Sequence, residues 1–353
     1  MELEKEDIYE LINKNLPGFK PANELQKLKG GNLNYVWRLE GNGRSLIIKH
    51  APPYIASNPD VPLSSERIHY EANALKLFEP AGMLNSLASD SIRPPALEYY
   101  NREQSLLIME DVGDLPELQT KIKDSATATT ISKILGRFIG EIHKRTFRSS
   151  KLKEYFDNHD IQQTRNKVQY QPAADYAGEV DKSNNEELKF RTQKLGQELM
   201  QTGRCLVMGD LWPPSILVKN DKLRIIDWEF AHFGRPLQDA GHFAAHCWMQ
   251  AHTTASVKQA QLWKNIWESF WQEYQQATGN IFPVLFDNNE LSGMKIHIAA
   301  EILIRAAGPF KTGYVYNNLS SNDPKIKEAV ECAILTPESD IATIWNYLFA
   351  NNH

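Results

Sequence analysis

Residues 205–234 read CLVMGDLWPPSILVKNDKLRIIDWEFAHFG and carry the features that decide the fold. The runs LVMGD and SILV are apolar and predict two short buried strands. Between them, Pro213 and Pro214 can neither continue a helix nor donate to a strand ladder, so we expect a rigid loop. The stretch therefore predicts short strands around a stiff turn that carries the carboxylate of Asp210.

The carboxylates of this stretch have a spacing that suits phosphoryl transfer. Glu229 lies two residues after Asp227, which puts both on one side of an extended chain. Because Mg²⁺ prefers one or two carboxylates with water and phosphate beside them, Asp227, Glu229 and the Ser215 hydroxyl could hold it. Asp210 is then left to orient and deprotonate an attacking hydroxyl, as transfer from ATP requires. Singly, each carboxylate reads as an ordinary turn or strand residue, and only the joint spacing favours this chemistry.

The pattern Asp-x4-Ser followed by Ile-Ile-Asp-Trp-Glu resembles the catalytic and metal-binding loops of the aminoglycoside phosphotransferase and choline kinase superfamily. Within it, the serine and the Asp-x-Glu-Phe-Ala run are most similar to those of methylthioribose kinases. The resemblance implies a protein-kinase-like fold with two lobes. It also implies that Asp210 is the catalytic base and that Asp227 and Glu229, helped by Ser215, bind Mg²⁺.

The first third of the chain alternates short apolar runs with glycine turns, which is typical of an antiparallel sheet. One amphipathic helix interrupts these runs, and Ser64-Ser65-Glu66 forms its expected capping sequence. After a connector at 111–116, the pattern predicts helices at 128–146, at 186–202 and from 237 onward, with a polar stretch between the first two. The predicted class is α+β, with an N-lobe (1–113) and a mainly helical C-lobe (114–353). The predicted strands are 25–31, 34–41, 44–51, 96–100 and 105–110.

Several residues of the first third fit nucleotide binding. Lys49 ends the apolar run SLIIK, where a strand would project its ammonium toward a cleft. In the kinase-like fold such a lysine contacts the α- and β-phosphates and a helix glutamate, for which we predict Glu71, with Glu66 as the alternative. By the same resemblance, the glycine-rich turn over the phosphates is represented by Gly30, Gly31, Asn32 and Asn34. The segment that faces adenine is represented by Glu110 and Val112.

The motifs depart from the family at three points. Met208 stands where a histidine usually precedes the catalytic aspartate. Trp212 lies beside the base and favours an apolar or ring-bearing acceptor through stacking. Methylthioribose kinases have two consecutive arginines late in the C-lobe, where this chain has Ile304 and Arg305. We predict that Trp212, His232 and Arg305 contribute to the acceptor pocket.

The amino-acid composition excludes some classes of binding partner but says little about the activity. The 353 residues include 39 Lys and Arg against 44 Asp and Glu, a net charge of −5, which argues against a strongly basic nucleic-acid-binding protein. No export signal and no apolar run of membrane-spanning length is visible, so we expect a cytoplasmic protein without membrane partners.

The sequence thus predicts an ATP- and Mg²⁺-dependent enzyme that phosphorylates a hydroxyl of a small molecule, such as a sugar, an amino-alcohol or an antibiotic-like compound. The resemblance is also compatible with a homodimer. The alternative is a non-catalytic, nucleotide-binding protein of the pseudokinase type, which Met208 alone favours.

Overall fold

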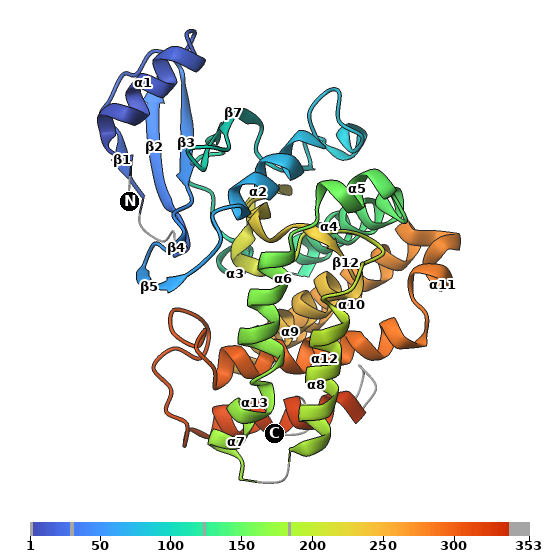
Figure 1. Ribbon diagram of the computed structural model, residues 1–353. Helices are drawn as coiled ribbons and strands as arrows, with labels where there is room; N and C mark the ends of the chain where they lie inside the picture. The colour runs from blue at the N-terminus through green and yellow to red at the C-terminus, as the bar shows by residue number, and fades with distance from the viewer. Residues whose placement is uncertain (1–2, 29–31, 123–124, 183–184, 339–353) are drawn as a thin grey trace. The chain divides into compact units, whose positions relative to one another are not determined.

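A computed structural model describes residues 3–28, 32–122, 125–182 and 185–338 of the chain. Its contacts divide the chain into two compact units, whose segments can be followed by residue number in Figure 1. The first consists of Met1–Leu115 and Arg224–Ala231, and the second of Pro116–Leu223 and His232–His353. The segment Arg224–Ala231, which carries Asp227 and Glu229, therefore joins a unit whose other residues end more than a hundred positions earlier in the sequence.

The first unit is built on a five-stranded antiparallel sheet in the order β1-β2-β3-β8-β7. The predicted antiparallel sheet is therefore confirmed. Helix α1 (Lys5–Asn15) packs on it through Ile8 and Ile12, which join a buried cluster with strand residues such as Trp37. This helix was not predicted, because only two of its eleven residues are buried and the rest of KEDIYELINKN is mainly polar. The strands are β1 Gln26–Lys27, β2 Tyr35–Gly41, β3 Arg44–His50, β7 Leu97–Asn101 and β8 Leu106–Glu110.

Helix α2 (Arg67–Lys76) is the predicted amphipathic helix of this unit. The prediction of a side-chain cap at its start is wrong, because Glu66 is the N-cap residue and makes no capping hydrogen bond. The segment Arg224–Ala231 contacts α2 and is held by Trp228, whose buried ring lies 5.5 Å from that of Phe78. The remaining strands of the first unit are β4 Tyr54–Ile55, β5 Asn58–Pro62 and β6 Ile92–Arg93.

The second unit is mainly helical, as predicted. Helix α4 (Ser125–Thr146) lies against α10 (Val257–Thr278) at close range, since a Cβ placed on Gly136 would lie 2.3 Å from the carbonyl oxygen of Phe270. Helix α9 (Leu237–Thr253) lies beside α12 (Asn288–Ala306). Most aromatic side chains of α10 are core residues, with Trp263, Trp267, Phe270 and Tyr274 buried and Trp271 half-buried.

The polar stretch after α4 was not expected to be helical, yet it folds into short helices and a π-helical turn (Asn166–Tyr170). Each of these short elements buries only a few of its residues, which leaves little periodicity in the sequence. The other elements of this unit are α3 Leu118–Lys121, α5 Ser150–Tyr155, α6 His159–Arg165, α7 Ala173–Val180, α8 Glu186–Glu198, β9 Cys205–Val207, β10 Ile216–Lys219, β11 Lys222–Ile225, which runs across the unit boundary, β12 His232–Gly234, α11 Phe282–Leu285 and α13 Pro324–Leu335. None of the helices in the described ranges has the length and apolar character needed to span a membrane.

Candidate active-site groups

Lys49 is the centre of a charged group in the first unit. It lies near the end of β3 with its side chain 6% exposed, and its Nζ is 2.8 Å from Glu71 Oε1 and 2.6 Å from Asp227 Oδ1. Burial disfavours the ammonium, but the carboxylates of Asp227, Glu71 and Glu229 outweigh that effect and raise the pKa of Lys49. The predicted pairing with Glu71 is confirmed, whereas the alternative, Glu66, pairs with Arg102.

Asp227 is held in an unusual backbone conformation. Its φ of 62° lies in the left-handed region, which a residue with a side chain adopts at a cost of order 1–3 kcal/mol. The next residue, Trp228, anchors the turn by burying its ring and donating its indole N–H to the carbonyl oxygen of Ile225 at 3.0 Å. Unlike its partners, the Asp227 side chain is 39% exposed. The loop therefore presents a solvent-accessible carboxylate next to a buried cation.

Glu229 is enclosed by two side chains that the sequence did not connect with it. Its Oε2 accepts a hydrogen bond from Asn34 Nδ2 at 2.9 Å and lies 3.2 Å from Arg67 Nε. The same Nε donates to Asn34 Oδ1 at 3.0 Å, so the three side chains form a closed group. Asn34 was predicted to serve the nucleotide, and in this structure its amide is engaged with Glu229 and Arg67.

Arg67 is a functional candidate that sequence reasoning missed. It is 1% exposed and lies four residues before Glu71, on the same side of α2, which is the only signal in the sequence that could have singled it out. Its guanidinium fills the space between several backbone segments of the first unit. It donates to the carbonyl oxygens of Leu33, Pro52, Tyr54, Leu63 and Ser64.

Asp227 fits the Mg²⁺ implied by the motif better than Glu229 does. Mg²⁺ needs only one or two protein carboxylates when phosphate and water fill the other positions, and Asp227 offers an exposed one. Glu229 has a side chain that is 7% exposed, and one of its oxygens is already engaged with Arg67 and Asn34. Among the described residues no cluster of three or more His, Cys, Asp or Glu side chains forms a complete metal site.

The other predicted nucleotide residues are spread over the first unit. Gly30 and Gly31 lie outside the described residues, and Asn32 is exposed. Glu110 receives hydrogen bonds from Arg93 at 2.7 Å and lies in β8, and its backbone N–H already donates to Ala96. Burial disfavours the charge of Glu110, but Arg93 outweighs it and lowers the pKa of the carboxyl. Val112 follows the strand and is half-buried.

The buried Glu71 predicts a pH dependence of stability. Burial raises its pKa from 4.5 to about 7, although Lys49 opposes the rise. Because folding makes this carboxyl harder to ionise, its contribution to the free energy of unfolding falls as pH rises from about 4.5 to about 7. We therefore expect the Tm of Glu71→Gln, relative to wild type, to rise through this interval and to stay level above it. Thermal melts of both proteins across this pH range measure the difference.

Glu66→Gln is the matched control, since Glu66 is partly exposed and lies on the same stretch of chain. Its Tm difference from wild type should stay small across the interval. A Tm difference for Glu71→Gln that does not change between pH 4.5 and pH 7 would contradict the assignment.

Asp210 stands on a tethered loop of the second unit. The buried carboxylate of Asp239 accepts hydrogen bonds from the backbone N–H groups of Met208 and Gly209, both at 2.8 Å, and from His143. Burial opposes the charge of Asp239, but these donors outweigh it and lower its pKa. Met208 is tethered here through its backbone, so the usual histidine can be replaced without loss of this anchor. Asp210 Oδ1 lies 3.1 Å from a guanidinium nitrogen of Arg165.

Ser215, the third predicted metal residue, is committed to the local turn. Its hydroxyl donates to the carbonyl oxygen of Trp212 at 2.8 Å, and its side chain is completely buried. The bond closes the 3₁₀ turn Pro213–Ser215, which the two prolines initiate. Ser215 therefore stiffens the loop that follows Asp210 and belongs to the second unit, whereas Asp227 and Glu229 belong to the first.

Trp212 and Arg305, both predicted for the acceptor, lie together. The guanidinium carbon of Arg305 is 4.5 Å from the centre of the half-buried Trp212 ring, and its Nε donates to Glu301 Oε1 at 2.9 Å. The rings of His246 and Tyr314 lie 5.5 and 5.4 Å from that of Trp212. We call Trp212, His246, Arg305 and Tyr314 the aromatic group.

His232 does not share these contacts. It lies in β12 opposite Val207 and is 2% exposed. Burial lowers the pKa of His297, and His232 is among the neighbours that add to this effect. The prediction placed it in the acceptor pocket. Strand pairing instead buries its side chain, so a direct contact with an acceptor has no support in the structure.

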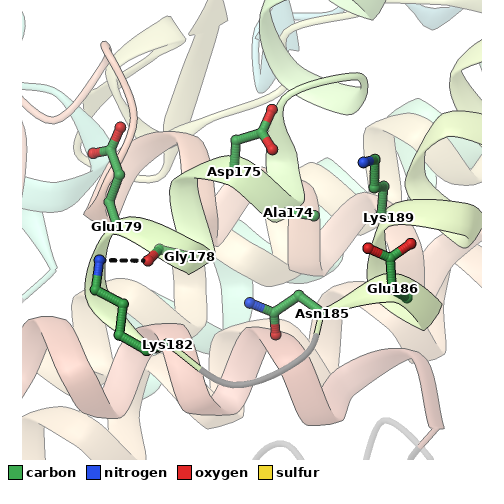
Figure 2. A pocket seen from close by; sticks show the side chains of 8 residues that line it. All are labelled: Ala174, Asp175, Gly178, Glu179, Lys182, Asn185, Glu186 and Lys189. Carbon is green, nitrogen blue, oxygen red and sulfur yellow. Dashed lines mark hydrogen bonds between the residues drawn. The ribbon is translucent and has the colours of Figure 1, made fainter.

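A surface pocket of about 440 Å³ lies along α7 and α8 (Figure 2). None of the predicted site residues lines it. Its charges largely compensate one another, since Asp175, Glu179 and Glu186 stand beside Lys182 and Lys189, and Lys182 donates to the carbonyl oxygen of Gly178. The charged groups above are therefore the better candidates for catalysis.

Comparison with known proteins supplies four similarities: a family model, two kinases and one solved structure. A model described as "Phosphotransferase enzyme family" matches residues 24–275. The chain is 27% identical to a 4-hydroxytryptamine kinase of Psilocybe cyanescens over 73% of this chain and 78% of that enzyme, and 26% identical to a methylthioribose kinase of Exiguobacterium sibiricum over 64% of this chain and 61% of that enzyme. A spectinomycin phosphotransferase, solved with ADP and spectinomycin, has the same fold with a TM-score of 0.52 at 14% identity, over 94% of this chain and 99% of that one.

Proposed function

Since the chain belongs to the phosphotransferase enzyme family and is a small-molecule kinase, we propose that it transfers the terminal phosphoryl group of ATP to a hydroxyl on a ring-bearing small molecule. The family and the kinase-like fold confirm the resemblance read from residues 205–234. They also favour an enzyme over the non-catalytic alternative. The acceptor, the nucleotide and the metal are the parts proposed here.

The observation that carries the proposal is the buried cation of the first unit. Lys49 is held between Glu71 and Asp227, so its ammonium is fixed before any nucleotide binds. A fixed cation of this kind suits the phosphates of ATP, which carry negative charge that grows on the transferred group. The spectinomycin phosphotransferase with bound ADP is a further support for an adenine nucleotide.

In the proposed reaction the two units have different tasks. In the first, Lys49 neutralises the phosphates, and Asp227, with Glu229 in support, would hold Mg²⁺, which supplies positive charge to the phosphates. In the second, Asp210 accepts the proton of the acceptor hydroxyl while the tethered loop keeps its carboxylate in place. ATP consumption without and with added Mg²⁺, followed by addition of acceptor, tests the reaction.

The aromatic group favours an acceptor with a planar ring. Trp212 presents a half-buried ring, whereas Arg305, the counterpart of a sugar-binding arginine, is engaged with Glu301. Rings stack on tryptophan with a gain beyond simple burial. The similarity to a 4-hydroxytryptamine kinase also supports a hydroxyl attached to an aromatic ring. Methylthioribose, which has no aromatic ring, is therefore the less favoured acceptor.

Substitution of Trp212 tests this choice. We expect Trp212→Ala to raise the KM for an aromatic acceptor such as 4-hydroxytryptamine by about tenfold, while Trp212→Phe, which keeps a ring, stays within about threefold of wild type. The KM for ATP should not change in either variant. Steady-state kinetics with 4-hydroxytryptamine and with methylthioribose as acceptors provide the measurement. Equal acceptor KM values for the alanine and phenylalanine variants would rule out stacking on this ring.

A further inference from the structure

We infer that Arg165 is a positioning residue for Asp210, and that Gln169 connects it to the carboxylate that supports the aromatic group. The inference rests on the proposed function, because it takes Asp210 as the base. It adds two residues that no motif singled out, from a stretch that the sequence pattern left without helices.

Arg165 contacts the catalytic loop in two places. One guanidinium nitrogen donates to the carbonyl oxygen of Gly209 at 2.7 Å and to Asp210 Oδ1 at 3.1 Å. The Arg165 side chain is only 11% exposed, and that of Asp210 is 20% exposed. Burial disfavours the guanidinium charge, but Asp210 and other neighbours outweigh it and raise the pKa of Arg165. A permanent cation therefore holds both the backbone and the side chain at the base.

This contact distinguishes the two oxygens of Asp210. Oδ1 is engaged by Arg165, and within the described ranges Oδ2 has no hydrogen bond. A general base must hold one oxygen within hydrogen-bond reach of the hydroxyl it deprotonates. The fixed guanidinium orients the carboxylate so that Oδ2 is the oxygen left for the acceptor hydroxyl.

The π-helical turn Asn166–Tyr170 follows Arg165 directly and presents Gln169 to it. Such turns are rare and occur frequently at functional sites. Arg165 donates to Gln169 Oε1 at 2.9 Å, and Gln169 Nε2 donates to Glu301 Oε2 at 2.7 Å. Gln169 is 2% exposed, so both ends of its amide are committed inside the unit.

Glu301 completes the connection. Its other oxygen, Oε1, lies 2.9 Å from Arg305 Nε and 3.1 Å from His246 Nε2, and both of these residues belong to the aromatic group. Burial disfavours its charge, but Arg305, His246 and His242 outweigh it, so the pKa of Glu301 is lowered and the carboxylate stays ionised. One continuous set of hydrogen bonds thus runs from Asp210 through Arg165, Gln169 and Glu301 to the residues around Trp212.

Two substitutions with matched controls test the connection. Arg165→Lys keeps the positive charge but not the guanidinium that contacts both Gly209 and Asp210. We expect kcat to fall about 10–100-fold, with the KM for ATP within twofold of wild type. Gln169→Leu keeps the volume but removes the hydrogen bonds to Arg165 and Glu301, along with the contact to His242, and we expect kcat to fall about fivefold. Gln162→Leu is the control for Gln169, since Gln162 is also buried, lies on α6 and, among the described residues, donates only to the carbonyl oxygen of Leu199. Arg235→Lys is the control for Arg165, because Arg235 is a half-buried, ion-paired arginine of the same unit.

Chemical rescue separates positioning from structural support. In Arg165→Ala, added methylguanidinium should restore part of kcat, whereas methylammonium at equal ionic strength should not. The inference would be overturned by a wild-type kcat in Arg165→Lys or by a folded Arg165→Ala that methylguanidinium does not rescue. Equal effects of Gln169→Leu and Gln162→Leu on kcat would also overturn it. Asp210→Asn is measured in parallel: if it is inactive while Arg165→Lys is fully active, only the inference fails, and if it is fully active, the proposed function itself fails.

Discussion

Asp210→Asn should lower kcat by about 10²–10⁴-fold and leave the KM for ATP within about twofold, because the amide cannot accept the acceptor proton. The substitution keeps the shape of the side chain. The loop stays tethered, because the backbone N–H groups of Met208 and Gly209 still donate to Asp239. Folding should therefore be unaffected. Steady-state rates with saturating ATP and acceptor, together with a thermal melt, provide the measurement.

The matched control for this variant is Asp221→Asn. Asp221 is an exposed aspartate between β10 and β11, a few residues further along the same segment. We expect its kcat to stay within about twofold of wild type, as surface substitutions generally do little. An Asp210→Asn enzyme that retained more than about a tenth of the wild-type kcat would show that another group deprotonates the acceptor.

Lys49→Met should lower kcat/KM for ATP by about 10²–10³-fold, since a fixed cation at the phosphates is lost. The same change leaves the buried carboxylate of Glu71 without its partner, and removal of one member of a buried ion pair costs about 3–5 kcal/mol. A lower Tm should therefore accompany the loss of activity. Kinetics at varied ATP and a thermal melt measure the two effects separately.

Lys76→Met is the control for this variant. Lys76 ends α2 in the same unit, and its ammonium lies 5.2 Å from the ring centre of Tyr100, away from any carboxylate that Lys49 contacts. It should change kcat/KM for ATP by less than about twofold. The double variant Lys49→Met with Glu71→Gln should recover part of the Tm but none of the activity. Recovery of activity in the double variant would mean that Lys49 serves the fold and not the nucleotide.

The sequence pattern was informative for candidate residues that lie in, or directly after, a clearly patterned strand or helix. Lys49 ends a clear apolar strand and Glu71 lies in a clear amphipathic helix, but it was the resemblance to kinase-like folds that led us to predict their pairing. Asp210 and Asp227 follow apolar strands in a short segment, and their spacing was informative for the same reason. His232 shows the limit of prediction from sequence, since it was predicted for the acceptor pocket and its side chain is buried in strand β12 instead.

The residues that the sequence could not reveal act across long separations. Arg67 joins Glu229 from more than 160 positions away, and Arg165 reaches Asp210 from 45 positions away. Neither lies in a motif, because an arginine can approach a carboxylate from any direction that packing permits. The π-helical turn that presents Gln169 is likewise a product of packing, since the polar stretch around it has no clear periodicity.

Residues 205–234 were thus enough to predict the family and the reaction class, because phosphoryl transfer constrains which residue types must follow one another on a short loop. Folding decided which oxygens of those groups are occupied. Glu229 became enclosed by Arg67 and Asn34, Ser215 closed its own turn, and one oxygen of Asp210 was bound by Arg165. These outcomes depend on burial and on contacts between distant segments, which arise only when the whole chain has packed.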